Sequence, residues 1–111
     1  MTNREIATEY LRRFCAGDIE GLEPLLAPEL RFSGTFHTFH SRKEYLDTLK
    51  ENPPEECGYR VVSVTENEDS VALFYEYQKP GGVLQIAQLF KIRSNRIQEV
   101  LLVFDGRGFS P

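Results

Sequence analysis

The sequence contains very little cysteine, no tryptophan and no long apolar run. Its two cysteines, Cys15 and Cys57, are too few for the disulfide framework of a small secreted domain, so both thiols are expected to be reduced. No segment approaches the ~20 consecutive apolar residues of a membrane span, and the polar N-terminus lacks the apolar centre of a signal peptide. The sequence therefore predicts a soluble, cytoplasmic protein without a membrane partner.

Positive charge is also scarce. The chain has 13 Lys and Arg against 17 Asp and Glu, which gives a net charge of −4 at pH 7. Its basic residues are scattered, and the longest basic runs are the pairs Arg12-Arg13 and Arg42-Lys43. Nucleic acids and anionic membranes select for clustered Lys and Arg, so neither is expected as a partner. The sequence has no glycine-rich phosphate-binding loop either, and no cofactor is expected.

The sequence does contain enough apolar side chains for one folded domain. With 111 residues, of which 41% are hydrophobic, residues 1–111 are expected to form a single domain with its own core. The first half has the apolar period of helices. A capping box at residues 2–5 begins a helix of roughly 14 residues. Gly17 ends this helix, and short helical turns are expected around Pro24.

A strand, a third helix and a meander of strands are expected to follow. Residues 30–36 alternate with period two, which predicts a half-buried strand. A second capping box, at residues 41–44, begins a helix that Pro53 stops. The second half predicts four strands separated by short turns, and therefore antiparallel hairpins, at residues 59–66, 71–79, 83–93 and 96–105. Helices followed by such a meander indicate an α+β fold.

Neither face of the predicted sheet is polar enough to lie in open water. One face is almost wholly apolar and is expected to pack on the helices, with Gln88 as a polar exception. The opposite face carries charges toward the strand ends, and its apolar centre consists of Phe74, Ala87, Leu89, Leu101 and Val103. An apolar centre with a charged rim is typical of an interface. We therefore expect a homodimer that forms through this face of the sheet.

The stretches 10–20 and 25–32 resemble the start of the nuclear transport factor 2-like superfamily, in its SnoaL-like and ketosteroid isomerase-like branches. Both show a helix, a Gly-Asp break, a short helix and a strand. Residues 40–46 are similar to the family's start of the third helix, and residues 95–100 to its turn into the last strand. The resemblance implies a cone-shaped fold, in which a strongly curved antiparallel sheet wraps the helices around an internal pocket. It also implies dimers through the sheet.

The resemblance indicates which chemistry to test. Ketosteroid isomerases use an aspartate base on the first strand, and a tyrosine and a protonated acid donate to the developing oxyanion. Counted from the Gly-Asp break, the tyrosine position falls on Tyr10, the acid position on Gln88 and the base position on Gly34. Because Gly34 has no side chain, isomerisation by that mechanism is not expected. Tyr10 and Gln88 can still donate hydrogen bonds to a ligand oxygen.

Eight residues are predicted to line the pocket and contact a ligand, because aromatic walls with few polar groups are typical of small-molecule sites. They are Tyr10, Phe14, Phe32, Tyr45, Tyr75, Tyr77, Gln88 and Phe104. This pattern favours a homodimer that binds a small hydrophobic molecule. A filled aromatic core, and an interaction module without a pocket, remain alternatives.

A further alternative is an isomerase- or cyclase-type enzyme with a polyketide- or steroid-like substrate. His37, His40 or Asp105 would then have to supply the acid or base. His37 and His40 lie three positions apart, but the sequence has no Cys or carboxylate cluster near them, so no metal site is expected. The sequence itself assigns no catalytic residue.

Overall fold

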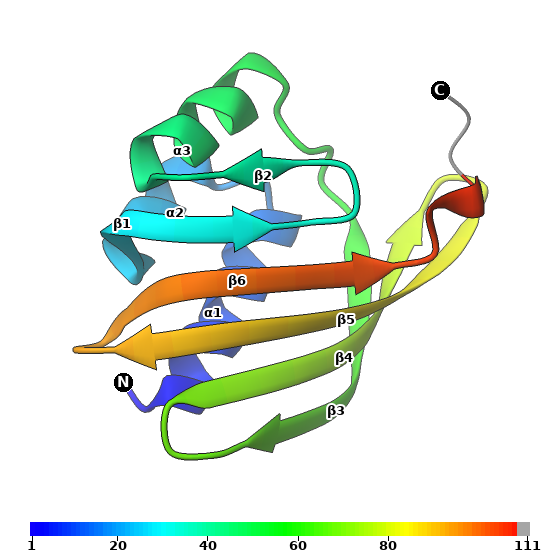
Figure 1. Ribbon diagram of the computed structural model, residues 1–111. Helices are drawn as coiled ribbons and strands as arrows, with labels where there is room; N and C mark the ends of the chain where they lie inside the picture. The colour runs from blue at the N-terminus through cyan, green and yellow to red at the C-terminus, as the bar shows by residue number, and fades with distance from the viewer. Residues whose placement is uncertain (109–111) are drawn as a thin grey trace.

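The computed structural model describes residues 1–108, in which helices pack on one face of a six-stranded sheet (Figure 1). The elements in chain order are α1 (Asn3–Cys15), α2 (Ile19–Leu22), the 3-10 helix η1 (Glu23–Leu25), β1 (Leu26–Ser33), β2 (Thr38–Phe39), α3 (Arg42–Glu51), β3 (Gly58–Glu66), β4 (Ser70–Lys79), β5 (Gly82–Arg93), β6 (Arg96–Phe104) and the 3-10 helix η2 (Gly106–Gly108). The predicted α+β fold is confirmed.

The first helix begins and ends where the sequence predicts. The Thr2 hydroxyl accepts a hydrogen bond from the Glu5 backbone N–H, and the Glu5 carboxylate accepts one from the Thr2 backbone N–H. This capping box satisfies two backbone donors that the helix cannot satisfy itself. After α1, Gly17 has a φ of +74°, a left-handed conformation that costs glycine little. Tyr10 lies on the buried face of the helix.

The first strand differs from the prediction. The sequence pattern places it at residues 30–36, but β1 starts four residues earlier and ends at Ser33, so both predicted ends are wrong. Pro28, expected to close the helical pair, lies inside β1 in the segment where the register against β6 shifts. Proline is tolerated at such an irregularity because its missing N–H breaks no ladder hydrogen bond there. The chain then turns and returns as the short β2, which the sequence analysis did not predict.

The four later strands match the prediction to within one residue at each end. Local turn geometry explains the match. Ser94 and Asn95 both have positive φ, 53° and 62°, as the two-residue turn between β5 and β6 requires. The complete strand order is β2-β1-β6-β5-β4-β3, with β1 parallel to β6 and the remaining pairs antiparallel.

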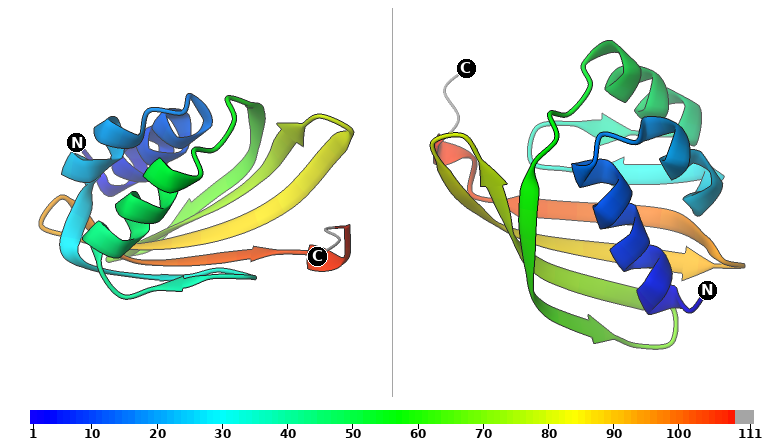
Figure 2. Two further views of the ribbon diagram at one scale, coloured as in Figure 1. Left: turned by 90° about the horizontal axis from the view of Figure 1, so that it is seen from above. Right: turned by 180° about the vertical axis from the view of Figure 1, so that it is seen from behind.

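The sheet bends around the helices, so that α1 crosses its concave face and α3 lies over β1 and β2 (Figure 2). Phe90 and Leu73 on this inner face are fully buried. The predicted assignment of strand faces is therefore confirmed, including Gln88, which is only 3% exposed. None of the helices within residues 1–108 has the length and apolar character needed to cross a lipid bilayer.

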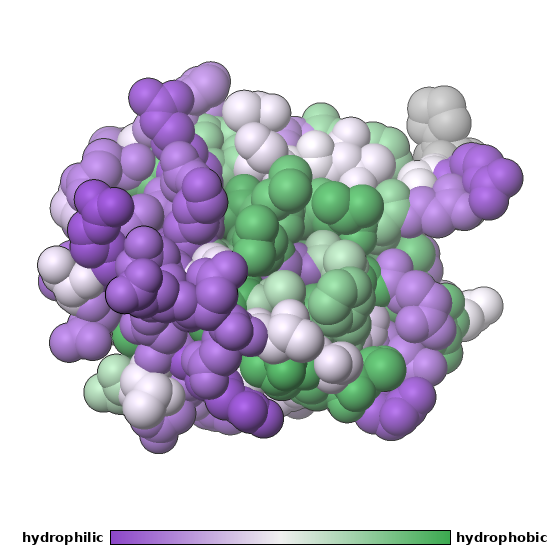
Figure 3. All heavy atoms as spheres, turned by 60° about the horizontal axis from the view of Figure 1, so that its bottom comes forward, coloured by the Kyte–Doolittle hydropathy of each residue, from purple (hydrophilic) through white to green (hydrophobic). Residues whose placement is uncertain are grey.

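The outer face of the sheet leaves large apolar side chains in solvent. Phe74 is 44% exposed, Leu101 47% and Val103 52%, and they lie on the neighbouring strands β4, β5 and β6 together with the half-buried Leu89. We call these four residues the outer patch. Figure 3 shows hydrophobic side chains gathered at the centre of one face, with hydrophilic side chains around them.

Candidate ligand-binding site

A cavity of about 450 Å³ opens between the helices and the inner face of the sheet. All eight residues predicted to line a pocket border this cavity: Tyr10, Phe14, Phe32, Tyr45, Tyr75, Tyr77, Gln88 and Phe104. That these residues form a binding pocket and contact a ligand stays a prediction. A pocket of this size accommodates a small organic molecule, since ligand sites usually measure roughly 300–1,000 Å³.

Four elements bring the polar groups of the cavity together. Tyr10 comes from the buried face of α1 and Tyr45 from the first turns of α3. Tyr75 and Gln88 come from the adjacent strands β4 and β5, where Tyr75 pairs with Ile86. Gln88 lies two residues beyond Ile86 on the same face, so the two polar side chains are diagonal neighbours.

These four side chains form two hydrogen-bonded pairs that lie next to each other in the interior. The Tyr75 hydroxyl donates to the Gln88 amide oxygen at 2.7 Å. The Gln88 side chain also lies close to the Tyr10 hydroxyl, where it opposes the rise of the Tyr10 pKa. The hydroxyls of Tyr10 and Tyr45 hydrogen-bond to each other. We call Tyr45, Tyr10, Gln88 and Tyr75 the polar chain.

The polar chain contains more donors than it uses. Three phenols and one primary amide carry three O–H and two N–H protons. One O–H proton goes from Tyr75 to Gln88, and a single proton lies between Tyr10 and Tyr45. One hydroxyl proton and the two amide protons of Gln88 are not used in these bonds. The polar chain can therefore donate to a hydrogen-bond acceptor, such as a carbonyl or carboxylate oxygen.

Burial keeps these phenols protonated. It is the largest cause that raises the pKa of Tyr10, Tyr45 and Tyr75 above the ordinary value, because the interior disfavours a phenolate. Hydrogen bonds from Tyr45 and Gln88 only partly oppose this for Tyr10. At neutral pH the three tyrosines are therefore hydrogen-bond donors and not bases.

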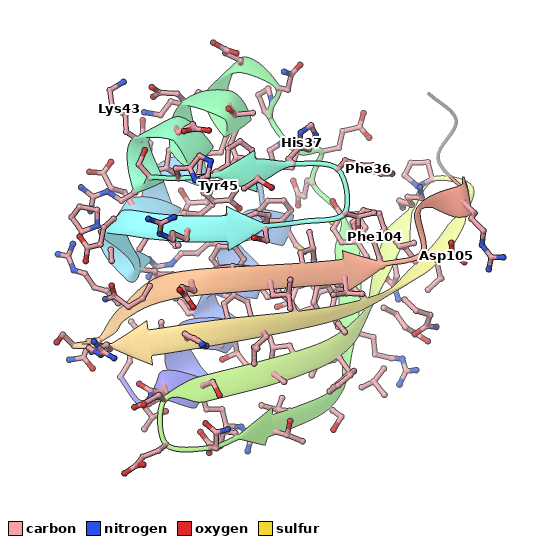
Figure 4. All side chains as sticks on the ribbon, in the orientation of Figure 1. Phe36, His37, Lys43, Tyr45, Phe104 and Asp105 are labelled. Atoms are coloured by element: carbon pink, nitrogen blue, oxygen red, sulfur yellow. The ribbon has the colours of Figure 1, made fainter. Side chains whose placement is uncertain are left out.

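The rest of the cavity wall is aromatic. Phe32 stacks on Tyr45 with ring centroids 4.9 Å apart, and Phe36 meets Phe104 edge to face at 5.7 Å. Figure 4 shows Phe36, His37 and Phe104 near the free ends of the β1–β2 hairpin and β6. Phe36 is 57% exposed at this end, so the aromatic surface continues from the interior to the solvent.

The structure separates the three candidate acid–base residues. His37 borders the cavity, exposed to solvent, in the turn after Gly34, whose backbone N–H donates to the His37 carbonyl at 2.8 Å. His40 is exposed beyond β2 and does not border the cavity. Asp105 lies just after β6, where its ion pair with Arg107 lowers the pKa of the Asp105 carboxyl. Among the described residues that border the cavity there is no carboxylate.

Several residues that border the cavity were not predicted, and the sequence pattern could have indicated two of them. Thr48 and Asn52 border the cavity from α3 and its C-terminal cap. They follow Tyr45 by three and seven positions, which is the spacing of one helix face. Once Tyr45 was predicted to border the pocket, the same spacing could have predicted Thr48 and Asn52. Phe39 had no such signal, because β2 itself was not predicted. Within the described part of the chain, no group of three or more His, Cys, Asp or Glu side chains can hold a metal ion.

Comparison with known proteins gives one family and one fold. The sequence model of the SnoaL-like domain matches residues 7–100. A search of curated proteins finds no match. An NTF2-like protein of unknown function from Cytophaga hutchinsonii ATCC 33406 has a similar structure, with a TM-score of 0.83 and 18% identity over 97% of this chain and 94% of that chain.

Two further solved structures share this fold. A hypothetical protein with a ketosteroid isomerase-like fold from Catenulispora acidiphila DSM 44928, in complex with trimethylamine, has a TM-score of 0.75 and 16% identity over 94% of this chain and 88% of that chain. A de novo designed protein with a curved β-sheet has a TM-score of 0.78 and 19% identity over 95% and 88%. At such low identities the likeness establishes the architecture and not the activity.

Proposed function

The chain belongs to the SnoaL-like domain family, and on that premise we propose that its cavity binds a small hydrophobic molecule with an oxygen acceptor at the buried end. The observation that carries the proposal is the polar chain in an otherwise aromatic cavity. The aromatic wall would bury the apolar body of the ligand, and the remaining donor protons of Tyr10, Tyr45 and Gln88 would bind its oxygen.

A purely structural role for the polar chain is the competing explanation. Buried hydroxyls and amides need partners wherever they lie, since an unpaired buried polar group costs about 1–3 kcal/mol. Each oxygen of the chain already takes part in a hydrogen bond, but one hydroxyl proton and the amide protons of Gln88 are not used within it. These unused donors support a ligand oxygen as their acceptor.

Binding of two matched probes tests the proposal. We expect 2-acetylnaphthalene to bind more tightly than 2-ethylnaphthalene, because only the ketone has an oxygen acceptor. Tyr10→Phe should weaken binding of the ketone by about fivefold, the equivalent of about 1 kcal/mol for a neutral hydrogen bond. The same change should leave binding of the hydrocarbon nearly unaltered. Isothermal titration or competition with a fluorescent dye provides the measurement.

Tyr59→Phe is the matched control for this experiment, because Tyr59 packs at the edge of the core but does not border the cavity. It should bind both probes like the unchanged protein. Equal affinity of the unchanged protein for ketone and hydrocarbon would contradict the proposed role of the polar chain.

The second candidate function is an isomerase- or cyclase-type enzyme, and the placement of His37 at the cavity is the observation in its favour. A base on the first strand is missing, since Gly34 borders the cavity without a side chain. We therefore expect no measurable turnover of a β,γ-unsaturated steroid ketone, followed by absorbance of the conjugated product. Turnover abolished by His37→Ala would favour the enzyme. Turnover that survives both His37→Ala and His40→Ala would mean that the base lies elsewhere.

We further propose that the protein is a homodimer through the outer patch. Exposed apolar side chains on β4 and β6, with the half-buried Leu89 of β5 between them, support this, because such clusters are rare on monomers unless they bind something. The charges around the patch are balanced: Lys91 pairs with Glu99 at 3.5 Å on one side, and Arg60 pairs with Glu76 at 2.9 Å on another. A rim with both signs can meet a two-fold-related copy of itself without net repulsion.

A further inference from the structure

The fold brings the two cysteines of the chain together, although 41 residues separate them in sequence. Cys15 is the last residue of α1 and is buried, with 2% of its surface exposed. Cys57 lies directly before β3 and is partly exposed. The Cys57 backbone N–H donates to the Cys15 carbonyl oxygen at 3.0 Å, and both side chains are free thiols.

This backbone contact keeps the two residues within the range of a disulfide. Standard bond lengths and an N···O distance of 3.0 Å hold the two Cα atoms within roughly 6–7 Å. A disulfide needs Cα atoms about 4.4–6.8 Å apart. The two thiols also lie close enough to interact, since Cys57 contributes to the raised pKa of the Cys15 thiol. A bond between them therefore requires little movement of the backbone.

We propose that Cys15 and Cys57 form a reversible intramolecular disulfide when a peroxide oxidises the protein. The sulfur of Cys57, as its thiolate, attacks a peroxide oxygen, the O–O bond breaks, and a sulfenic acid and one water form with the proton that Cys57 released. The Cys15 sulfur then loses its proton and attacks the Cys57 sulfur, whose S–O bond breaks as a second water leaves. Two thiols are oxidised, and one hydrogen peroxide is reduced to two waters.

The environments of the two thiols set the order of these steps. Burial, followed by the hydrogen bond with Cys57, raises the pKa of the Cys15 thiol to about 12. Cys15 is therefore protonated and shielded, and the partly exposed Cys57 is the sulfur that a peroxide reaches first. The buried Cys15 thiol then lies next to the sulfenic acid of Cys57, which is the position that a resolving cysteine requires.

The bond would tie the segment between α3 and β3 to the end of α1. This segment contributes Asn52 to the cavity wall, and the Cys57 thiol helps to raise the pKa of Tyr77, another cavity residue. A disulfide at this position closes a loop of about 40 residues and removes conformations from the unfolded chain. Oxidation is therefore expected to raise the thermal unfolding midpoint by on the order of 10 °C, and a reductant should reverse the shift.

Mass spectrometry of the purified protein treated with hydrogen peroxide tests the proposal. We expect the intact mass to fall by about 2 Da, because two hydrogens are lost, and to return with dithiothreitol. Digestion without reductant should yield one peptide pair joined through Cys15 and Cys57. Non-reducing electrophoresis should show the mass of a single chain, since the bond is intramolecular.

Two variants keep the result interpretable. In Cys15→Ala the sulfenic acid has no resolving thiol, so Cys57 should instead gain about 16 or 32 Da as oxygen is added. Cys57→Ala changes only the partly exposed residue and should show neither the loss of mass nor the rise of the unfolding midpoint. Oxygen addition to the unchanged protein without the linked peptides, or a disulfide between two chains, would overturn the proposal.

Discussion

Leu101→Lys is expected to convert the protein from a dimer into a monomer at tens of micromolar, a usual concentration for sedimentation. Leu101 lies near the middle of the outer patch, paired with Leu89 across β5 and β6. In a dimer a lysine at this position would lose its water without gaining a partner, which costs several kcal/mol. Association should therefore weaken by at least about 100-fold. Sedimentation velocity of both proteins over a concentration series measures the effect.

The monomer itself should tolerate this change, because Leu101 is 47% exposed before any association. Ala16→Lys is the matched control: it adds the same charge at the exposed cap of α1, on the helical side of the sheet. This control should sediment like the unchanged protein. If the unchanged protein is a monomer at tens of micromolar, the proposed dimer is refuted. If both variants dissociate equally, the dimer does not form through the outer patch.

The parts of the fold that the sequence predicts well are those that depend on neighbouring residues. The hairpins of β3 to β6 follow from short turns, and the positive φ of Ser94 and Asn95 shows the local conformation behind the signal. β1 was misplaced because its ends depend on parallel pairing with β6, a contact far away in sequence. Pro28 then looked like a helix stop, whereas the sheet accommodates it at an irregularity.

The same division applies to the site. Strand alternation predicts that Gln88 points inward, and its 3% exposure confirms the register. The aromatic walls follow from the same alternation. The bond between Tyr10 and Tyr45 could not be predicted from spacing, because it depends on how α1 and α3 approach each other over the sheet. The sequence also could not predict which of His37 and His40 borders the cavity, because this depends on the conformation of the turn between β1 and β2.

Gln88 is the residue whose change tests the polar chain most severely. In Gln88→Glu a protonated carboxyl has almost the shape of the amide, with a carbonyl oxygen for the Tyr75 hydroxyl and an O–H for Tyr10. An ionised carboxyl keeps the acceptor for Tyr75 but gives Tyr10 no donor, and it buries a charge at a position with 3% exposure. No Lys or Arg side chain is among the described residues of the cavity wall to pair with that charge.

Gln88→Glu is therefore expected to be close to the unchanged protein in stability at acidic pH and strongly destabilised at neutral pH. Burial raises the folded-state pKa of the new carboxyl above its unfolded value of about 4.3. Stability is then fully present below about pH 4 and is lost as the pH rises through the folded-state pKa. If that pKa is 7 or higher, the loss at pH 7 is about 3–4 kcal/mol, or more than ~10 °C in the unfolding midpoint. Thermal unfolding of both proteins from pH 4 to pH 8 measures this loss of stability. Gln78→Glu is the control, because Gln78 is exposed on the same strand as Tyr75, and its stability relative to the unchanged protein should not fall with pH. A stability difference between Gln88→Glu and the unchanged protein that does not change with pH would mean that position 88 is open to water.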